Sequence, residues 1–225
     1  MVSAAADKRP RPVRLLLRAL SLAATLALGA PFAAAQERYQ HTIPRERPYT
    51  LSFTPDGGAI HLRGRIHHGV TRDLAELLQR ADAVNSLHLE SAGGLVAEAR
   101  GLVVTVRRAG MDTVAVGDCL SVCTLVLMSG ENRYLVHGAR LGFHAYRLVG
   151  GFAAAFIDAE DEQQRDMDLF RDREVSEAFI ARVIATPHDG MWYPSPEELL
   201  DAGLVDALVV PPGARSQGHP AAQAP

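Results

Sequence analysis

Lysine is almost absent from this chain of 225 residues. Lys8 is the only one, and arginine supplies the remaining fixed basic charge. A lysine therefore cannot act as a general base beyond the first residues, which excludes a serine–lysine dyad there. Basic side chains also do not gather in the body of the chain, and the net charge is −3. The sequence thus lacks the positive patch of a nucleic-acid-binding protein, and we expect no nucleic-acid partner.

The N-terminal region lacks an apolar run long enough to span a membrane. The run at 19–31 is uncharged but shorter than the roughly 18 to 20 residues that a spanning helix needs. Basic residues precede it, and Ala33 and Ala35 form an A-x-A cleavage site before Gln36. We predict a signal peptide over 1–35 and export, with a bacterial periplasm as the destination. The alternative is an uncleaved N-terminal anchor, the only form in which we expect contact with a membrane.

Cysteine is scarce too, with only Cys119 and Cys123. Export to an oxidising compartment makes them candidates for a disulfide, provided that their Cα atoms lie within about 7 Å. Two alternatives stay open. The cysteines could be buried thiols that only pack, or metal ligands with His144, although two cysteines and one distant histidine are a poor zinc pattern. We expect no metal, and a cysteine nucleophile is disfavoured because an exposed thiol would oxidise there.

Apolar periodicity predicts one α/β domain over 50–210, after a polar linker at 36–49 and before a disordered tail at 211–225. The apolar share of 48% is enough for a core. Strands are predicted at 50–53, 59–66, 84–90, 111–116, 133–136, 140–145 and 204–210. Helices are predicted at 70–81, 95–109, from 121 onward, within 158–184 and from 195 onward. This alternation favours a mostly parallel sheet covered by helices.

Three of these segments carry finer expectations. Thr71 and Asp73 are placed to cap the helix at 70–81. Gly117 and Asp118 are turn-forming residues after the strand at 111–116. The acidic run 158–168 is typical of a helix face in water.

Ser121 follows that predicted turn and opens a helix. A serine at such a position gains from the positive end of the helix dipole and from free backbone N–H groups, which favours a nucleophile. The alternative is a plain N-cap, the commonest task of a serine there. In a parallel sheet the functional residues gather at the carboxyl ends of the strands. Ser121, the segment 91–94 and His144 are all predicted at such ends.

These residue types together match the needs of acyl transfer, which are a nucleophile, a base and an oxyanion hole. Ser121 is the predicted nucleophile and His144 the predicted base. Glycines let backbone N–H groups face a ligand, so Gly93 and Gly94 are predicted to bind the oxyanion together with the N–H of Val122. Asp189 is the candidate for the carboxylate that orients the imidazole.

Four short motifs in this order resemble the Clp protease proteolytic subunit and its relatives in the Clp/crotonase superfamily. They are Ser-Ala-Gly-Gly before a helix, Ser121 on its turn, Gly-Phe-His, and Ser-Pro-Glu-Glu-Leu-Leu-Asp-Ala-Gly-Leu-Val-Asp. The resemblance as a whole covers roughly 60–209. The resemblance implies repeated ββα units and homo-oligomers. It also implies a serine peptidase in which Ser121 and His144 act beside a glycine oxyanion loop.

The sequence departs from the family pattern at three places. Ala92 replaces the proline of the oxyanion loop, and cysteines flank Ser121 where the family carries small residues. Met191 stands at the aspartate position, two residues after Asp189. The substituted loop and the missing aspartate favour one alternative, a catalytically silent periplasmic binding or scaffold protein. A second alternative is a crotonase-type acyl-CoA enzyme with the same oxyanion loop, although export argues against it because CoA esters are cytosolic. A periplasm lacks the ATP that drives the family's unfoldase partners, so we expect an ATP-independent enzyme that uses peptides or unfolded chains and no cofactor.

Overall fold

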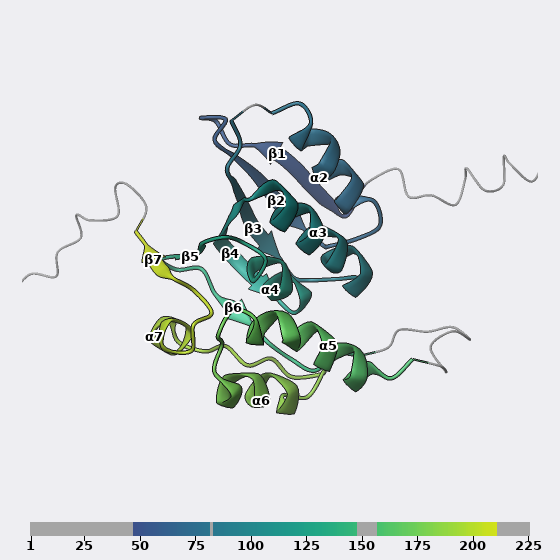
Figure 1. Ribbon diagram of the computed structural model, residues 1–225, viewed down its shortest axis with the longest axis vertical. Coiled ribbons are helices and arrows are strands. Elements are labelled where there is room, and N and C mark those ends of the chain that lie inside the picture. The colour runs from purple at the N-terminus through teal and green to yellow at the C-terminus, as the bar shows by residue number, and fades with distance from the viewer. Residues whose placement is uncertain (1–46, 82, 148–156, 211–225) are drawn as a thin grey trace, which may run out of the picture. The chain divides into compact units, whose positions relative to one another are not determined.

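A mostly parallel sheet organises the computed structural model, which describes residues 47–81, 83–147 and 157–210. The described residues from Pro48 onward belong to one structural unit. The sheet runs in the order β1-β2-β3-β4-β5-β7, and β6 pairs with β4 (Figure 1). Its strands are β1 (Tyr49–Phe53), β2 (Ala59–Gly64), β3 (Ser86–Ser91), β4 (Asp112–Leu120), β5 (Arg133–Val136), β6 (Leu141–Gly142) and β7 (Ala207–Val209). Only the pairing of β1 with β2 is antiparallel among these strands, which confirms the predicted sheet.

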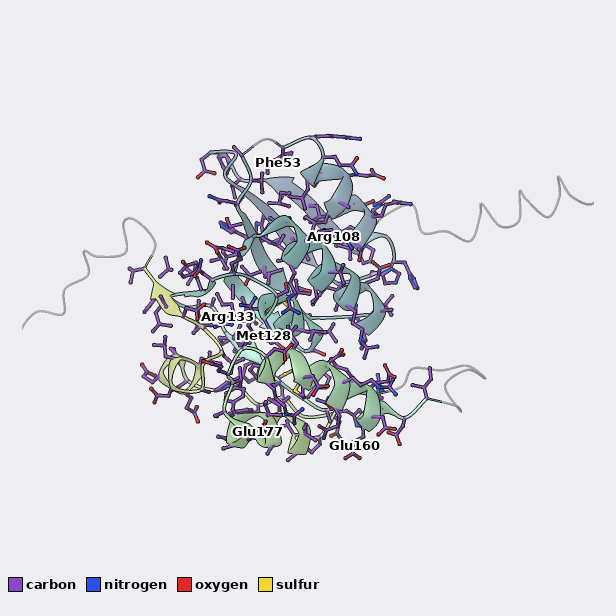
Figure 2. All side chains as sticks on the ribbon, viewed as in Figure 1. Phe53, Arg108, Met128, Arg133, Glu160 and Glu177 are labelled. Carbon is purple, nitrogen blue, oxygen red and sulfur yellow. A yellow bond between two sulfur atoms is a disulfide. The ribbon has the colours of Figure 1, made fainter. Side chains whose placement is uncertain are left out.

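The helices of the described ranges are α2 (Val70–Leu78), α3 (Val96–Ala109), α4 (Val122–Leu127), α5 (Ala159–Arg171), α6 (Glu177–Ala185) and α7 (Pro196–Asp201). Figure 1 shows α2 and α3 lying along the sheet, with α5 and α6 beside each other near β6. None of them is long and apolar enough to cross a membrane. Arg108, Glu160 and Glu177, which are labelled in Figure 2, are exposed, whereas Met128 is fully buried. The predicted helices and strands are therefore present, with shifts of a few residues at their ends.

The alternation of side chains along the strands explains how the core forms. In β2 and β3 the apolar residues Ile60, Leu62, Leu87 and Leu89 are fully buried on one face of the sheet. The residues between them, such as His88, lie on the opposite face and are only partly buried. A period of two therefore places one apolar face of these strands against the helices.

The strand β4 runs past the predicted turn. Leu89 pairs with Ala115 while Ser91 pairs with Cys119, so β4 has two more residues than β3 over this stretch. Gly117 lies within this irregular stretch of β4. A Cβ added to Gly117 would lie 2.7 Å from the side chain of Glu90. The prediction of a turn at 117–118 is therefore wrong, because a β-bulge absorbs these residues and the strand continues to Leu120. The bulge carries the chain directly to Ser121.

A carboxylate from another helix caps the start of α2. The N-cap of α2 is Gly69, and its first turn has no cap from its own side chains, so the predicted cap by Thr71 and Asp73 is wrong. Instead, Glu98 of α3 accepts hydrogen bonds from the N–H of Gly69 (2.9 Å) and from the N–H and hydroxyl of Thr71 (3.2 and 2.7 Å). Burial raises the pKa of Glu98, but these hydrogen bonds outweigh burial and hold the pKa below its ordinary value. The cap thus joins α2 to α3.

We expect Glu98→Gln to lower the free energy of unfolding by about 1 kcal/mol at pH 7, as for the loss of a helix cap. Because the folded pKa is lowered, this stabilisation is complete above the ordinary glutamate pKa of about 4.3 and is lost as the pH falls through the lower folded value. Urea unfolding at pH 7 and pH 3 checks both points. The exposed Glu76 of α2 offers a control, since Glu76→Gln removes a carboxylate at a distance of 3.6 Å from Arg72. Equal effects of the two variants at pH 7 would contradict the cap.

Candidate active site

Ser121 stands on a strained turn between β4 and α4. Its backbone angles are φ 55° and ψ −130°, a region that non-glycine residues rarely occupy. Neighbours hold the turn: the N–H of Ser121 donates to the carbonyl of Gly142 (2.8 Å), and its carbonyl accepts from the N–H and hydroxyl of Thr124 (2.9 and 2.8 Å). The side chain makes no capping hydrogen bond to α4. The N-cap alternative therefore does not account for the hydroxyl, and strain of this kind is concentrated at functional sites.

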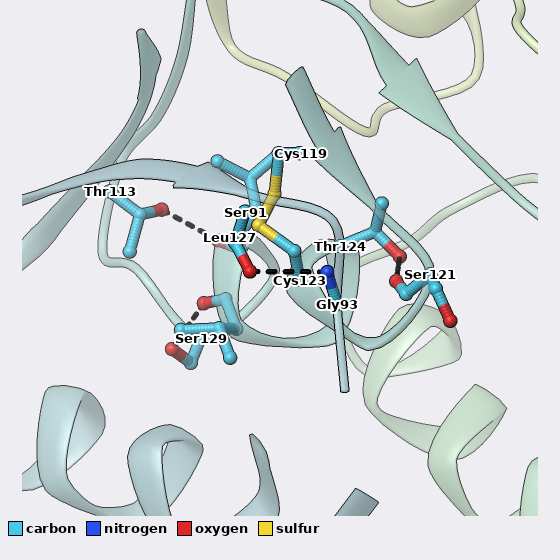
Figure 3. The surroundings of a disulfide bond; sticks show 10 residues. Ser91, Gly93, Thr113, Cys119, Ser121, Cys123, Thr124, Leu127 and Ser129 are labelled. Carbon is cyan, nitrogen blue, oxygen red and sulfur yellow. Dashed lines mark hydrogen bonds between the residues drawn. A yellow bond between two sulfur atoms is a disulfide. The ribbon is translucent and has the colours of Figure 1, made fainter. Parts of the chain in front are cut away.

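A disulfide brackets Ser121, which confirms the prediction for the two cysteines. Cys119 at the end of β4 and Cys123 in α4 are bonded, with their Cα atoms 5.2 Å apart. Both are fully buried. Figure 3 shows the disulfide on the inner side of the turn, with the hydroxyl of Ser121 pointing away from it. The bond therefore links the strand and the helix on the two sides of Ser121 without occupying its hydroxyl.

The glycine loop after β3 packs directly against this turn. Gly93 has φ 84°, and an added Cβ would lie 2.7 Å from the carbonyl of Leu120 and 2.8 Å from the Cβ of Ser121. The N–H of Gly93 donates to the hydroxyl of Ser91 (3.1 Å; Figure 3). Within the described ranges, the N–H groups of Gly94 and Val122 have no acceptor. Gly94 and Val122 thus keep N–H groups available to an oxyanion, whereas the N–H of Gly93, which was predicted to bind the oxyanion too, is already bonded to Ser91.

His144 lies just beyond β6 rather than inside a strand. The preceding residue, Phe143, exchanges backbone hydrogen bonds with Trp192 (2.9 Å each). The Nδ1 atom of His144 lies 2.7 Å from the carbonyl oxygen of Ala145. A carbonyl can only accept, so Nδ1 carries the proton, and in the neutral imidazole Nε2 then keeps its lone pair. This is the tautomer that a general base needs.

Ser121 and His144 line the same narrow pocket, in which about 10 Å³ is open to the centre of a water molecule. Among the described residues, the two side chains make no hydrogen bond to each other. Catalytic hydrogen bonds are often long before substrate binds, so their absence does not separate the pair chemically. The rest of the lining is mainly apolar and comes from α4, α5, α6 and the segment after β6: Thr124, Leu125, Phe143, Tyr146, Gln163, Met167, Phe170 and Val183.

Asp189 does not join this group. It is exposed in the loop after α6, and it accepts no hydrogen bond from His144 in the described part of the chain. The same loop does reach the histidine segment through its backbone, because the carbonyl of Thr186 accepts from the N–H of Ala145 (2.7 Å). The nitrogen that a third carboxylate would bind is already bonded to the carbonyl of Ala145. The structure thus places Ser121, His144 and the glycine loop together and leaves Asp189 outside.

Helix α5 contributes to the site in a way that the predictions from the sequence did not include. The carboxylate of Asp166 is only 7% exposed and is held by Arg100 of α3 (2.7 and 3.1 Å), so the whole run 158–168 is not a solvated face. It also accepts from the hydroxyl of Tyr146 (2.8 Å). Burial, together with the charge of Asp166, raises the pKa of that hydroxyl, which stays protonated and donates. The sequence did carry one signal for this buried helix face, because Gln163, Met167 and Phe170 recur at helical spacing. In the structure all three are buried.

A second, larger pocket lies near the edge of the sheet formed by β5 and β7. Its volume is about 470 Å³, within the range of ligand sites. Its lining is mostly apolar and contains neither Ser121 nor His144: Leu135, Val136, His137, Gly138, Ala139, Arg140, Tyr193, Pro194, Pro196, Leu199, Leu208 and Val210. We therefore assign the chemistry to the smaller pocket, which holds both a nucleophile and a base. No cluster of three or more potential metal ligands exists within the described residues.

The topology and the placement of the serine turn define a Clp protease-like α/β fold. One solved structure that shares it is a mutant of ClpP1 from Listeria monocytogenes, with a TM-score of 0.57 and 18% sequence identity over 69% of this chain and 92% of that chain. No model of a known protein family matches the sequence, and no curated protein matches it either. At this identity the similarity establishes the fold, and the chemistry has to be argued from the residues of this chain.

Proposed function

We propose that the protein is a serine peptidase that cleaves peptides through Ser121 and His144. The observation that carries the proposal is the strained turn at Ser121, which frees the hydroxyl beside a correctly protonated His144 and two unpaired N–H groups. The serine turn, the histidine and the two N–H groups each have a purely structural explanation when taken alone. Together they supply the nucleophile, the base and the oxyanion donors that acyl transfer requires.

The reaction follows from these positions. The hydroxyl oxygen of Ser121 attacks the peptide carbonyl, and Nε2 of His144 takes its proton. The N–H groups of Gly94 and Val122 donate to the oxygen that becomes negative. His144 then returns the proton to the leaving amine as the C–N bond breaks, which leaves an acyl group on Ser121. Water, deprotonated by His144, releases the acid and restores the serine.

The proposal extends to the setting of the enzyme. The N-terminal sequence supports export, and the disulfide beside Ser121 fits an oxidising compartment. Such a compartment offers no ATP-driven unfoldase, so the substrates are peptides or already unfolded chains. We also propose that the protein assembles with copies of itself, as the family resemblance implies. Neither a metal nor an organic cofactor takes part in the mechanism.

A second candidate function has one specific observation in its favour. Asp189 does not reach His144, so the third member of a catalytic triad is missing from the described contacts. A protein that kept the fold and lost catalysis would bind peptides at the surface beside Ser121 without cleaving them. The two candidates differ in the reactivity of Ser121.

Labelling by a fluorophosphonate probe measures that reactivity, because the probe forms a covalent bond with an activated serine. We expect the purified protein to be labelled, and Ser121→Ala to lose the label completely. Ser129→Ala is a suitable control, since Ser129 lies in the same part of the chain but is buried and bonded to the carbonyl of Val126 (2.6 Å). Absence of labelling in the wild-type protein, with and without reductant, would contradict the peptidase and favour the silent binding protein.

A further inference from the structure

The peptide group between Ala145 and Tyr146 connects His144 to helix α5. Its carbonyl oxygen accepts from Nδ1 of His144 (2.7 Å). Its N–H donates to Oε1 of Gln163 (3.0 Å). A single planar unit therefore carries both hydrogen bonds, and any rotation of that unit moves the imidazole as well.

Gln163 is built into the helix so as to hold this unit. Gln163 is only 3% exposed, although its side chain is polar. Its amide nitrogen lies 3.5 Å from the carbonyl oxygen of His144, a second and weaker contact on the same segment. The two contacts agree on the orientation of the amide, because a backbone N–H needs an oxygen and a carbonyl needs an N–H. Gln163 therefore fits both of its amide atoms to the backbone around His144.

Gln163 and the peptide group between Ala145 and Tyr146 have an effect on His144 similar to that of the carboxylate in a catalytic triad. In a triad, a carboxylate fixes the tautomer and orientation of the histidine and stabilises its protonated form. Here the oxygen of Gln163 polarises the peptide N–H, which makes the peptide carbonyl a better acceptor for the imidazole. The chain of dipoles is neutral, so it supplies orientation and tautomer with less charge stabilisation than a carboxylate.

We propose that Gln163 is the positioning residue of His144 and acts through the peptide bond between Ala145 and Tyr146. The proposal rests on the proposed roles of Ser121 and His144. It explains how the histidine keeps a defined tautomer although Asp189 is exposed and apart from it.

Other charges near this segment are already paired or exposed. Asp166, one turn after Gln163, is bound by Arg100 and accepts from Tyr146, so its carboxylate is committed to those partners. Arg100 also binds Glu162 (2.6 Å). The loop that meets Ala145 carries the exposed His188 and Asp189. The acceptor at Nδ1 of His144 is thus the peptide carbonyl.

The test compares Gln163→Leu, Gln163→Glu and the control Gln164→Leu. Gln164 is a partly buried neighbour on the same helix, and its side chain makes no hydrogen bond within the described residues. The rate of fluorophosphonate labelling is measured against pH. We expect Gln163→Leu to label about 10- to 100-fold more slowly, as for loss of an outer-shell partner of a histidine. Its pH midpoint should move down, because the imidazolium loses a polarised acceptor. Gln163→Glu keeps the acceptor, so its rate should stay within a few-fold and its midpoint should move up.

A second measurement reads the same property without catalysis. Long-range ¹H–¹⁵N correlation spectra report the protonation of each ring nitrogen in the nine histidines, and His144→Ala assigns the signals of His144. We expect the Nδ1-protonated form in the wild-type protein and in Gln164→Leu, and a mixture of tautomers in Gln163→Leu. An unchanged tautomer in Gln163→Leu would overturn the proposal, as would equal pH midpoints in the two Gln163 variants. Failure of the peptidase itself is distinguishable, because it would remove wild-type labelling and leave the spectra as expected.

Discussion

Replacing Gly93 with alanine should slow the labelling of Ser121 by at least about 100-fold, the effect of displacing a reacting group by about 1 Å. The new Cβ would lie 2.7 Å from the carbonyl of Leu120 and 2.8 Å from the Cβ of Ser121, both closer than side chains tolerate. The backbone at φ 84° also disfavours any residue with a Cβ. Either the glycine loop or the serine turn must move, and each movement separates the nucleophile from the oxyanion donors. Single-turnover labelling rates provide the measurement.

Gly138→Ala separates the two causes of this effect. Gly138 has φ 90°, close to the value at Gly93, but nothing lies within 4 Å of an added Cβ. We expect Gly138→Ala to cost about 1 to 2 kcal/mol of stability through the backbone alone and to label at the wild-type rate. If both alanine variants label normally, the packing of the glycine loop against Ser121 has no bearing on reactivity.

Asp166→Ala should lower the free energy of unfolding by about 2 to 3 kcal/mol, since it leaves a buried hydroxyl unpaired and removes an ion pair. The hydroxyl of Tyr146 would lose its acceptor at 2.8 Å. Arg100 would lose two hydrogen bonds, but its side chain is 38% exposed, so water and Glu162 compensate in part. Urea unfolding, followed by circular dichroism, measures the loss.

Two further variants test the cause of that loss. In a Tyr146→Phe background, Asp166→Ala should cost clearly less, because no hydroxyl is then left unpaired. Asp168→Ala, on the same helix, removes a carboxylate that is 71% exposed and bound to Arg171, and we expect a change within about 0.5 kcal/mol. Equal losses in the Asp166 and Asp168 variants would contradict a special role for the buried carboxylate.

The sequence was most informative where a structural feature depends on neighbouring residues. Helix α7 is an example: Ser195, followed by Pro196 and by Glu198 at the third helical position, predicted a helix start, and the structure shows both hydrogen bonds of a capping box. The disulfide was predictable for the same reason, since its two cysteines are four residues apart. The position of Ser121 between a strand and a helix also followed from the local pattern, although the strand continues through the turn predicted at 117–118.

The features that could not be predicted all depend on partners distant in the sequence. Glu98 caps α2 at Gly69, 29 residues earlier in the chain, and Arg100 binds Asp166, 66 residues later. No local sequence pattern predicts either contact. The bulge at Gly117 depends on the register of β4 against β3, which a single strand does not reveal. Gln163 was overlooked because one buried glutamine in an acidic helix looks like part of its solvated face.

The disulfide also has a practical consequence for how the protein should be made. Its two cysteines flank Ser121, on which every proposed labelling assay depends, and both are fully buried. Reagents will therefore reach this bond slowly after folding, so the redox state in which the chain folds decides whether the bond is present. We expect material expressed in a reducing cytosol to carry two thiols and to lack the covalent link across the serine turn. Preparations from an oxidising host, checked by thiol titration under denaturing conditions, are the appropriate starting point for all the variants above.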